Sequence, residues 1–360
     1  MKPIFLAFAT LLSFNVSAKS PIIEESYLVK NDSTALYDVI RSRPEFIIDH
    51  LKGGSFELYG PNGLGKFLKQ NGAHFQNLEN QSSFVRSTYP TPEEIEKTLK
   101  TINKNFPAIT KLYSIGKSVK NRDLWVMKLS KNVNVDDARP EFKYIANMHG
   151  DEIVGRELMV RFIKELTENY GKDKRITELL DKTQIHILVS MNPDGAAAGT
   201  RYNTKGVDLN RDFPDFTTAD NMDSTNKRAP ETQAVMNWQG QHKFKLSANF
   251  HGGAEVVNYP WDTTPQKFDQ DELVKDISLE YAHNAPYIAA STQFENGITN
   301  GFAWYEVDGG MQDWSIHYRK DLQVTVELSD TKWPDYSTID YYYEQNRAAL
   351  IGFIERIHTL

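Results

Sequence analysis

The sequence predicts an α/β fold: an α/β/α sandwich with a mixed, mostly parallel central sheet, preceded by a small N-terminal appendage. Three observations support this prediction. From residue 91 onward, apolar runs of strand length alternate with helical patterns. Residues 185–191 (IHILVSM) are apolar almost throughout, as expected for a strand buried on both faces. The chain has 360 residues, 40% of them hydrophobic, which is enough for one large domain with a small addition.

The secondary-structure elements of the expected domain, residues 86–360, follow in order. Its first helix starts at Thr91, a capping residue, with Pro92 at the first helical position and two acids in the first turn, and it extends to about residue 106. Further helices are predicted at 154–169, 231–241, 271–283 and 339–358, and strands at 124–129, 142–148, 185–191, 247–250 and 322–328.

Residues 19–85 are more polar and carry turn signals at Gly53-Gly54 and at 60–63. A strand at 55–59 and a helix at 64–70 are predicted within them. We interpret this part as an N-terminal appendage, with a plain linker as the alternative. A strand-helix-strand pattern ahead of the larger domain also suggests a hypothesis about its role: residues 55–80 could form a small segment that packs against the larger domain and inhibits it.

The first 18 residues have the pattern of a secretory signal peptide. Lys2 supplies a positive charge, residues 3–16 are uncharged and mostly apolar, and Val16-Ser17-Ala18 supplies small residues for cleavage after Ala18. We therefore expect a secreted or periplasmic protein. A membrane anchor is the alternative, but the apolar run is shorter than the roughly 20 residues that span a bilayer. No later segment is long and apolar enough, so we expect no stable membrane insertion.

Composition excludes several functions. The formal net charge of −7 does not suit a nucleic-acid partner. The chain has no cysteine, so neither a disulfide framework nor thiol catalysis is available. The oligomeric state is left open.

Chemically active side chains lie at the ends of three predicted strands. His149 and Glu152 follow one strand directly, His251 follows another, and Glu327 comes late in a third. Ligands of open α/β sheets bind beyond the carboxyl ends of the strands. Two histidines and a glutamate are a common catalytic zinc set, and a second carboxylate can take a proton from water. Each residue alone has an ordinary structural alternative, so the prediction depends on their joint placement.

A loop at 201–215 brings Arg201, Asn210 and Arg211 toward the same edge. The planar fork of arginine suits a carboxylate or a developing oxyanion. A solvated charged loop is the alternative, and composition alone favours it.

Six segments in order resemble the zinc metallocarboxypeptidase family, and among its branches the carboxypeptidase N/E group, which includes carboxypeptidases D and M. They are MHGDE at 148–152, NPDG at 192–195, GVDLNRDFPD at 206–215, SANFHGGAEVVNYPWD at 247–262, ITNGFAWYEVDGGMQDW at 298–314 and VTVELSDTKWP at 324–334. The resemblance covers about 86–358. It implies one Zn²⁺ per chain and hydrolysis of the C-terminal peptide bond of peptides by a water activated at the zinc.

The resemblance also implies roles at the metal centre. His149, Glu152 and His251 match the zinc ligands. Asp208 matches the carboxylate that orients the first ligand histidine. Glu327 matches the general base.

Further roles concern the substrate. Arg201 matches the arginine that stabilises the oxyanion, and Asn210 and Arg211 match the pair that holds the terminal carboxylate of the peptide. Tyr305 matches the mobile tyrosine that closes over the substrate. Asp212 departs from the family pattern, because the branch usually has asparagine there.

Asp262 and Gln312 match specificity-pocket residues of the N/E branch. A buried carboxylate favours a cationic side chain, so we expect a preference for C-terminal Lys or Arg. A simple loop-opening role is the alternative for Asp262. For the whole protein, the alternatives are a cell-wall peptide hydrolase or deacylase on the same fold, and a catalytically inactive peptide-binding relative.

Overall fold

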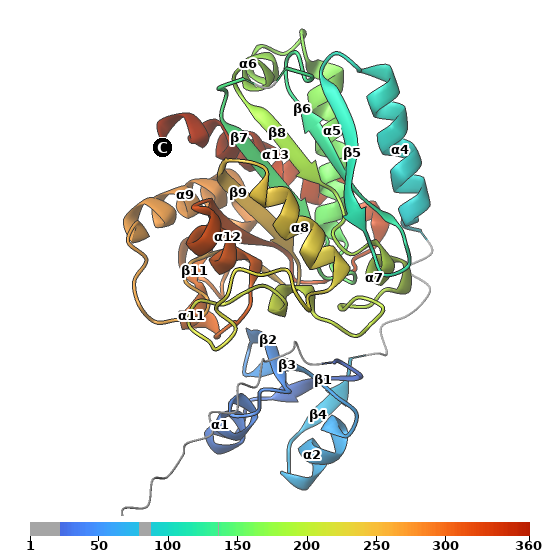
Figure 1. The fold of residues 1–360 in the computed structure, drawn as a ribbon. Coiled ribbons are helices and arrows are strands. Elements are labelled where there is room, and N and C mark those ends of the chain that lie inside the picture. The colour runs from blue at the N-terminus through green and yellow to red at the C-terminus, as the bar shows by residue number, and fades with distance from the viewer. Residues whose placement is uncertain (1–21, 79–87, 136) are drawn as a thin grey trace, which may run out of the picture.

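The computed structural model describes residues 22–78, 88–135 and 137–360. The predicted signal peptide lies outside the described residues. Figure 1 shows a small N-terminal unit (residues 22–78) below a larger C-terminal unit (residues 88–135 and 137–360). In the described part of the chain, no helix is both long enough and apolar enough to cross a bilayer.

One eight-stranded sheet forms the middle of the C-terminal unit, in the order β11-β10-β12-β9-β7-β8-β6-β5. Its strands are β5 (Thr110–Lys117), β6 (Asp123–Leu129), β7 (Glu141–Ala146), β8 (Gln184–Leu188), β9 (Phe244–His251), β10 (Ala254–Tyr259), β11 (Ile298–Asn300) and β12 (Leu322–Ser329). The central run β8-β7-β9-β12 is parallel, whereas β5, β6 and the β10–β12 pair are antiparallel. The prediction of a mixed, mostly parallel central sheet is confirmed.

Helices cover both faces of this sheet (Figure 1). Those whose apolar side chains join the larger core are α4 (Pro92–Asn105), α5 (Val154–Asn169), α6 (Lys174–Lys182), α9 (Asp271–Asn284) and α13 (Ile339–Glu355). A second core, packed by α8 (Pro230–Gly240) and α12 (Met311–Arg319), covers the other face. Shorter helices are α7 (Pro193–Ala198), α10 (Pro286–Ala289) and α11 (Gly301–Trp304). This is the predicted α/β/α sandwich.

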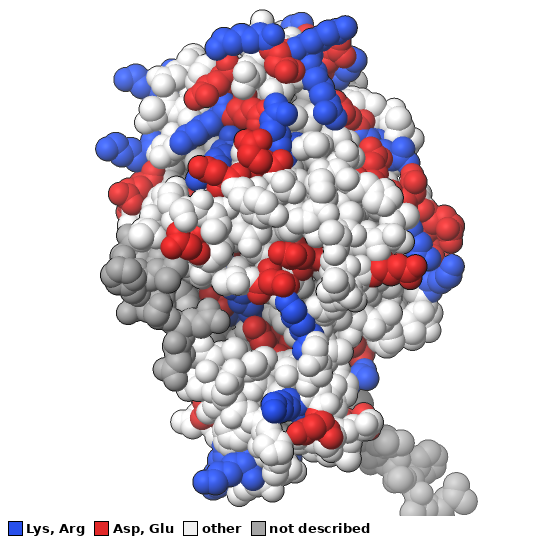
Figure 2. Space-filling model, turned by 180° about the vertical axis from the view of Figure 1, so that it is seen from behind, with Lys and Arg blue, Asp and Glu red and all other residues white. Residues whose placement is uncertain are grey.

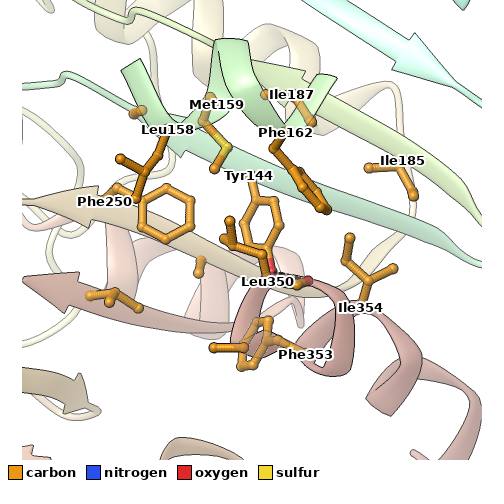
Figure 3. Close-up of a cluster of buried hydrophobic side chains, with 14 of the residues drawn as sticks. Tyr144, Leu158, Met159, Phe162, Ile185, Ile187, Phe250, Leu350, Phe353 and Ile354 are labelled. Carbon is orange, nitrogen blue, oxygen red and sulfur yellow. Dashed lines mark hydrogen bonds between the residues drawn. The ribbon is translucent and has the colours of Figure 1, made fainter. Parts of the chain in front are cut away.

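The larger core positions β7 and β9, which lead to the site. Tyr144 of β7 is fully buried among aromatic and aliphatic side chains from α5, β9 and α13 (Figure 3). Its hydroxyl donates a hydrogen bond of 2.9 Å to the Leu350 carbonyl, so the polar end of this core residue is satisfied. Such a close-packed core holds the strand ends rigidly.

Local sequence signals explain the best-predicted helices. Thr91 accepts from the backbone N–H of Glu94, and Glu94 accepts from that of Thr91, which completes a capping box at the start of α4. The predicted helix at 154–169 coincides with α5. The strand β5 was missed because its alternating polar and apolar residues are only partly buried.

The N-terminal unit is a folded structure, so the linker alternative is wrong for residues 22–78. Its elements are β1 (Glu25–Lys30), α1 (Thr34–Arg41), β2 (Ile47–Lys52), β3 (Ser55–Gly60), α2 (Leu64–Gln70) and β4 (Phe75–Asn77). The strands form an antiparallel sheet in the order β2-β3-β1-β4. Apolar residues of both helices and the sheet, among them Ile40, Leu58 and Leu68, form a separate core.

Candidate active site

Three buried donor groups meet at the carboxyl edge of the parallel strands. His149 and Glu152 lie in the loop after β7, and His251 is the last residue of β9. The Nδ1 atoms of His149 and His251 are 3.0 Å apart, and the Glu152 carboxylate lies 2.9 Å and 2.8 Å from them. These separations suit one tetrahedral Zn²⁺, whose ligand atoms are about 3.3 Å apart at the usual bond lengths. The residues therefore fit the metal.

The loop that carries the first two ligands is shaped by Asn147 and Gly150. Asn147 adopts a left-handed backbone conformation (φ 56°), and its Nδ2 donates to the carbonyls of His149 and Glu152 at 2.8 Å and 3.2 Å. A Cβ at Gly150 would lie 2.1 Å from the backbone of Gly195, so only glycine allows this approach. The loop conformation turns both ligands toward β9.

Asp208 and Arg201 form the layer behind the ligands. Asp208 Oδ1 accepts from Nε2 of His149 at 3.1 Å, which leaves Nδ1 for a metal. Asp208 Oδ2 accepts from Nε of Arg201 at 2.8 Å, and Arg201 Nη1 lies 3.2 Å from Glu152. Burial would raise the pKa of Glu152, but the two imidazoles hold it well below its usual range, so the carboxylate is the ligating form.

Glu327 lies beside the ligands on β12. Its backbone is in register with that of His251 on the neighbouring parallel strand β9. The side chain is 3% exposed, and within the described residues its Oε2 has no hydrogen-bond partner. A buried carboxylate with an unused oxygen can receive a proton from water held at the ligand cluster.

Asn210, Arg211 and Tyr305 line the same small cavity as the two ligand histidines. Asn210 Oδ1 accepts from the backbone N–H of Met311 at 3.0 Å, which fixes its amide. Arg211 Nη1 donates to the Asn210 carbonyl at 3.0 Å, and Nη2 donates to the carbonyl of Ile48 in the N-terminal unit at 3.4 Å. The structure thus brings the predicted carboxylate-binding pair to the predicted metal centre.

Asp262 is buried and also lines this cavity. Its Oδ1 accepts from Gln312 Nε2 at 2.9 Å and from Asn258 Nδ2 at 3.1 Å. Burial raises the pKa of Asp262 to about 7, with a further contribution from Asp215. Predicted residues Asp262 and Gln312 therefore do contact each other, and Asn258 is a partner that sequence reasoning missed.

Two residues of the N-terminal unit that the sequence analysis did not single out, Asp49 and His50, reach the predicted catalytic groups. Asp49, from β2 of the N-terminal unit, forms an ion pair with Arg201 and accepts from the Tyr305 hydroxyl. Burial would raise the pKa of Asp49, but Arg201 and other cations hold it well below its usual range, so it is ionised. His50 places Nε2 3.8 Å from Glu327.

The contact between the two units is closely packed around His50. This residue has a left-handed backbone (φ 47°), and a Cβ at Gly253 would lie 2.4 Å from its Nε2. His50 Nδ1 lies 3.2 Å from Glu57, and Glu57 in turn accepts from the partly buried Lys332 of the C-terminal unit at 2.6 Å. The cavity that remains at the site measures about 20 Å³, room for roughly one water molecule.

An α/β/α sandwich with two histidines and a glutamate at its carboxyl edge has the architecture of a zinc-dependent hydrolase. The chain belongs to the zinc carboxypeptidase family, whose model matches residues 95–349. It is 41% identical over 272 residues to carboxypeptidase SOL1 of Arabidopsis thaliana, covering 74% of this chain and 55% of that protein. It is 42% identical over 290 residues to carboxypeptidase D of Anas platyrhynchos, covering 74% and 21%. The chain thus spans about half or less of these curated relatives.

Solved structures share the fold over a longer part of the chain. The structure of thrombin activatable fibrinolysis inhibitor matches with a TM-score of 0.72 at 16% identity, covering 94% of this chain and 99% of that one. Carboxypeptidase A of Helicoverpa armigera matches with a TM-score of 0.74 at 17% identity, covering 92% and 97%. Residues 88–360 make up about three quarters of the chain, so both matches extend into the N-terminal unit.

Proposed function

We propose that this protein is a zinc-dependent exopeptidase that hydrolyses the C-terminal peptide bond of peptides, with a preference for C-terminal Lys or Arg. The observation that carries the proposal is the convergence of a metal-ligand set, a carboxylate base and an asparagine–arginine pair around one small cavity, which His149, His251, Glu327, Asn210 and Arg211 line. Family membership supports the same reaction.

His149, Glu152 and His251 would hold the Zn²⁺, which when bound supplies Lewis acidity toward water and the scissile carbonyl. Glu327 then takes the proton from the attacking water and passes it to the leaving amine. Arg201 lies beside Glu152 and is placed to stabilise the negative charge that develops on the carbonyl oxygen.

Asn210 and Arg211 restrict the reaction to chain ends. A terminal carboxylate can pair with the Arg211 guanidinium, whereas an internal peptide bond offers no charge to that position. Asp262 supports the Lys/Arg preference, because a cationic side chain in the pocket would compensate the buried carboxylate. Tyr305, which now contacts Asp49, would contact the substrate once the N-terminal unit is displaced.

Digestion of peptides that differ only in the C-terminal residue tests this function. We expect single-residue release from free C-termini, loss of activity on chelation and its return with Zn²⁺. Murein fragments and acylated amino acids are assayed beside them. Faster hydrolysis of either class would favour the cell-wall hydrolase or deacylase, and binding of peptides without turnover would favour an inactive relative.

We further propose that the N-terminal unit keeps the enzyme latent. Asp49 neutralises Arg201 and His50 lies beside Glu327, so groups required for catalysis are engaged by the protein itself. A cavity of about 20 Å³ leaves no room for a peptide. The hypothesis of an inhibitory segment is kept, but its main contacts come from residues 48–52 with Glu57 and Tyr59, rather than from 55–80 as a whole.

Limited proteolysis of the full chain between residues 78 and 88 tests latency. The intact chain should hydrolyse peptides at least tenfold more slowly than the cleaved protein after the two parts are separated. Equal rates would mean that the N-terminal unit is only structural.

Secretion or export to the periplasm is also part of the proposal, supported by the signal-like first 18 residues. N-terminal sequencing of the exported protein should find a chain that begins at Lys19. Recovery of the protein with Met1 retained would contradict it.

A further inference from the structure

A second group of metal-ligand side chains lies at the opposite end of β7 from the candidate active site. Glu141 is the first residue of β7, His186 lies within β8, and His242 lies in the turn between α8 and β9. We call these three residues the amino-edge cluster. None of them has a part in the proposed hydrolysis, yet the donor set is again two histidines and a glutamate.

The spacing of the donor atoms fits one ion. Glu141 Oε1 lies 2.7 Å from Nδ1 of His242 and 3.7 Å from Nε2 of His186, and the two imidazole centres are 4.8 Å apart. The two donor-atom distances, 2.7 Å and 3.7 Å, bracket the value of about 3.3 Å that separates two ligands of a tetrahedral zinc. We propose that the amino-edge cluster binds a second divalent transition-metal ion of the zinc type.

The His186 side chain supports this proposal most directly. It is fully buried, and within the described residues its Nε2 has no hydrogen-bond partner. An orphaned buried ring nitrogen that points at a carboxylate is unusual, because burying a polar atom without a partner costs free energy. A metal ion at the cluster would satisfy this nitrogen.

The other ring nitrogen of His186, Nδ1, is hydrogen-bonded as in known metal sites. Its Nδ1 lies 2.8 Å from the hydroxyl of Tyr113, and that hydroxyl also accepts from Nε1 of Trp238 at 3.0 Å. Hydrogen bonds to the other ring nitrogen orient ligand histidines in metalloproteins. If Nδ1 carries the proton and donates it to Tyr113, Nε2 is left as a lone-pair donor.

Access to the cluster is also suitable. The side chains of Glu141 and His242 are 19% and 20% exposed. The cluster is therefore reachable from solvent, and water can complete the coordination. Binding displaces the Nδ1 proton of His242.

Such an ion would tie the turn before β9 to β7 and β8. His242 and Glu141 are already joined by their hydrogen bond, and the backbone N–H of Lys243 donates to the other oxygen of Glu141 at 2.7 Å. This position is far along β7 from His149, so the ion would stabilise the sheet rather than take part in hydrolysis.

Metal stoichiometry tests the proposal. The full chain is stripped with a chelator, reloaded with Zn²⁺, desalted and measured by mass spectrometry for zinc per chain. Glu141→Gln and His242→Phe should each bind one equivalent less than the parent chain. His283→Ala, which removes an exposed histidine of α9, is the matched control and should keep the parental stoichiometry.

A His149→Ala chain separates the two centres, since it lacks a ligand of the active-site set. It should still bind one equivalent, and Glu141→Gln in that background should remove it. With Co²⁺ in place of Zn²⁺, the visible absorption of this remaining ion should vanish in the same double variant. Circular dichroism verifies folding, and if one variant does not fold, the other decides.

Retention of the parental stoichiometry in folded Glu141→Gln or His242→Phe would overturn the proposal. So would a His149→Ala chain that binds no metal. Loss of an equivalent in His283→Ala would assign the extra ion to surface histidines instead. Peptidase activity of Glu141→Gln should stay within about twofold of the parent.

Discussion

The C-terminal and N-terminal units contribute opposite charges to the same cavity. Arg201 and Arg211 of the C-terminal unit line it together with Asp49 of the N-terminal unit, and Lys332 and Glu57 form a further ion pair between the two units. Seen from behind in Figure 2, acidic and basic side chains lie close together around the junction of the two units. If Arg201 and Arg211 bind a carboxylate and an oxyanion as proposed, the same cations also form a binding site for an acidic segment of this chain.

The largest expected effect is a loss of turnover from a substitution in the C-terminal unit. Glu327→Gln, measured on the cleaved protein freed of the N-terminal unit, should lower kcat by about 10²–10⁴-fold, because proton transfer to and from Glu327 is lost. Zinc content should not change. Glu344→Gln, on the exposed face of α13, is the control. Near-parental turnover in Glu327→Gln would remove this residue from the mechanism.

A substitution in the N-terminal unit should instead raise the peptidase activity of the intact chain. Asp49→Ala in the intact chain leaves Arg201 without one of its carboxylates, and breaking a buried pair costs about 3–5 kcal/mol. We expect the intact variant to be at least tenfold more active than the intact parent. The matched control is Asp38→Ala on the exposed side of α1. If peptide hydrolysis is unchanged in Asp49→Ala, Asp49 does not restrain the site.

Asp262→Asn should change specificity and not latency. Losing one partner of a buried charged pair costs about 2–3 kcal/mol, so the kcat/KM ratio of C-terminal Arg over Leu peptides should fall at least tenfold. Zinc binding should be unaffected. Asp269→Asn, an exposed residue of the following loop, should keep the ratio. Faster cleavage of Leu or Phe peptides by the parent enzyme would contradict a role for Asp262 in Lys/Arg recognition.

The smallest expected effect is a pH dependence of that preference. The pKa of Asp262 is raised to about 7 by burial, so the carboxyl is largely neutral below this pH and ionised above it. The Arg-over-Leu ratio of the freed enzyme should therefore increase several-fold from pH 6 to pH 8. In Asp262→Asn the ratio should be flat over the same range. A parental ratio that falls as pH rises would contradict this assignment.

The elements and residues that could be predicted from the sequence are those that a short sequence pattern identifies. The α4 capping box and the apolar strand β8 are visible in short windows, and the ordered motifs lead to His149, His251 and Glu327. Asp49 and His50 belong to no such pattern. Their contacts with Arg201 and Glu327 join positions more than 150 residues apart, and these contacts arise from packing between two units.

The amino-edge cluster could not be predicted from the sequence either, although all three of its residues belong to the C-terminal unit. Glu141, His186 and His242 come from three separated segments with no motif spacing, and only the register of β7, β8 and β9 brings them together. Asn258, the second partner of Asp262, was missed for a different reason. It lies inside β10, a strand that the prediction omitted.

The ion pairs between the two units have a consequence for how the enzyme would be switched on. They are non-covalent, and the Arg201–Asp49 pair among them is buried, so cutting the chain between residues 78 and 88 breaks none of them. Before the cut, the N-terminal unit is an intramolecular partner with an effective concentration of the order of millimolar. After the cut it is a separate molecule, so its binding depends on the protein concentration. A nicked sample should therefore stay inhibited when concentrated and gain activity on dilution. The time course of activation would then report the dissociation rate of the N-terminal unit, and not the rate of the cut.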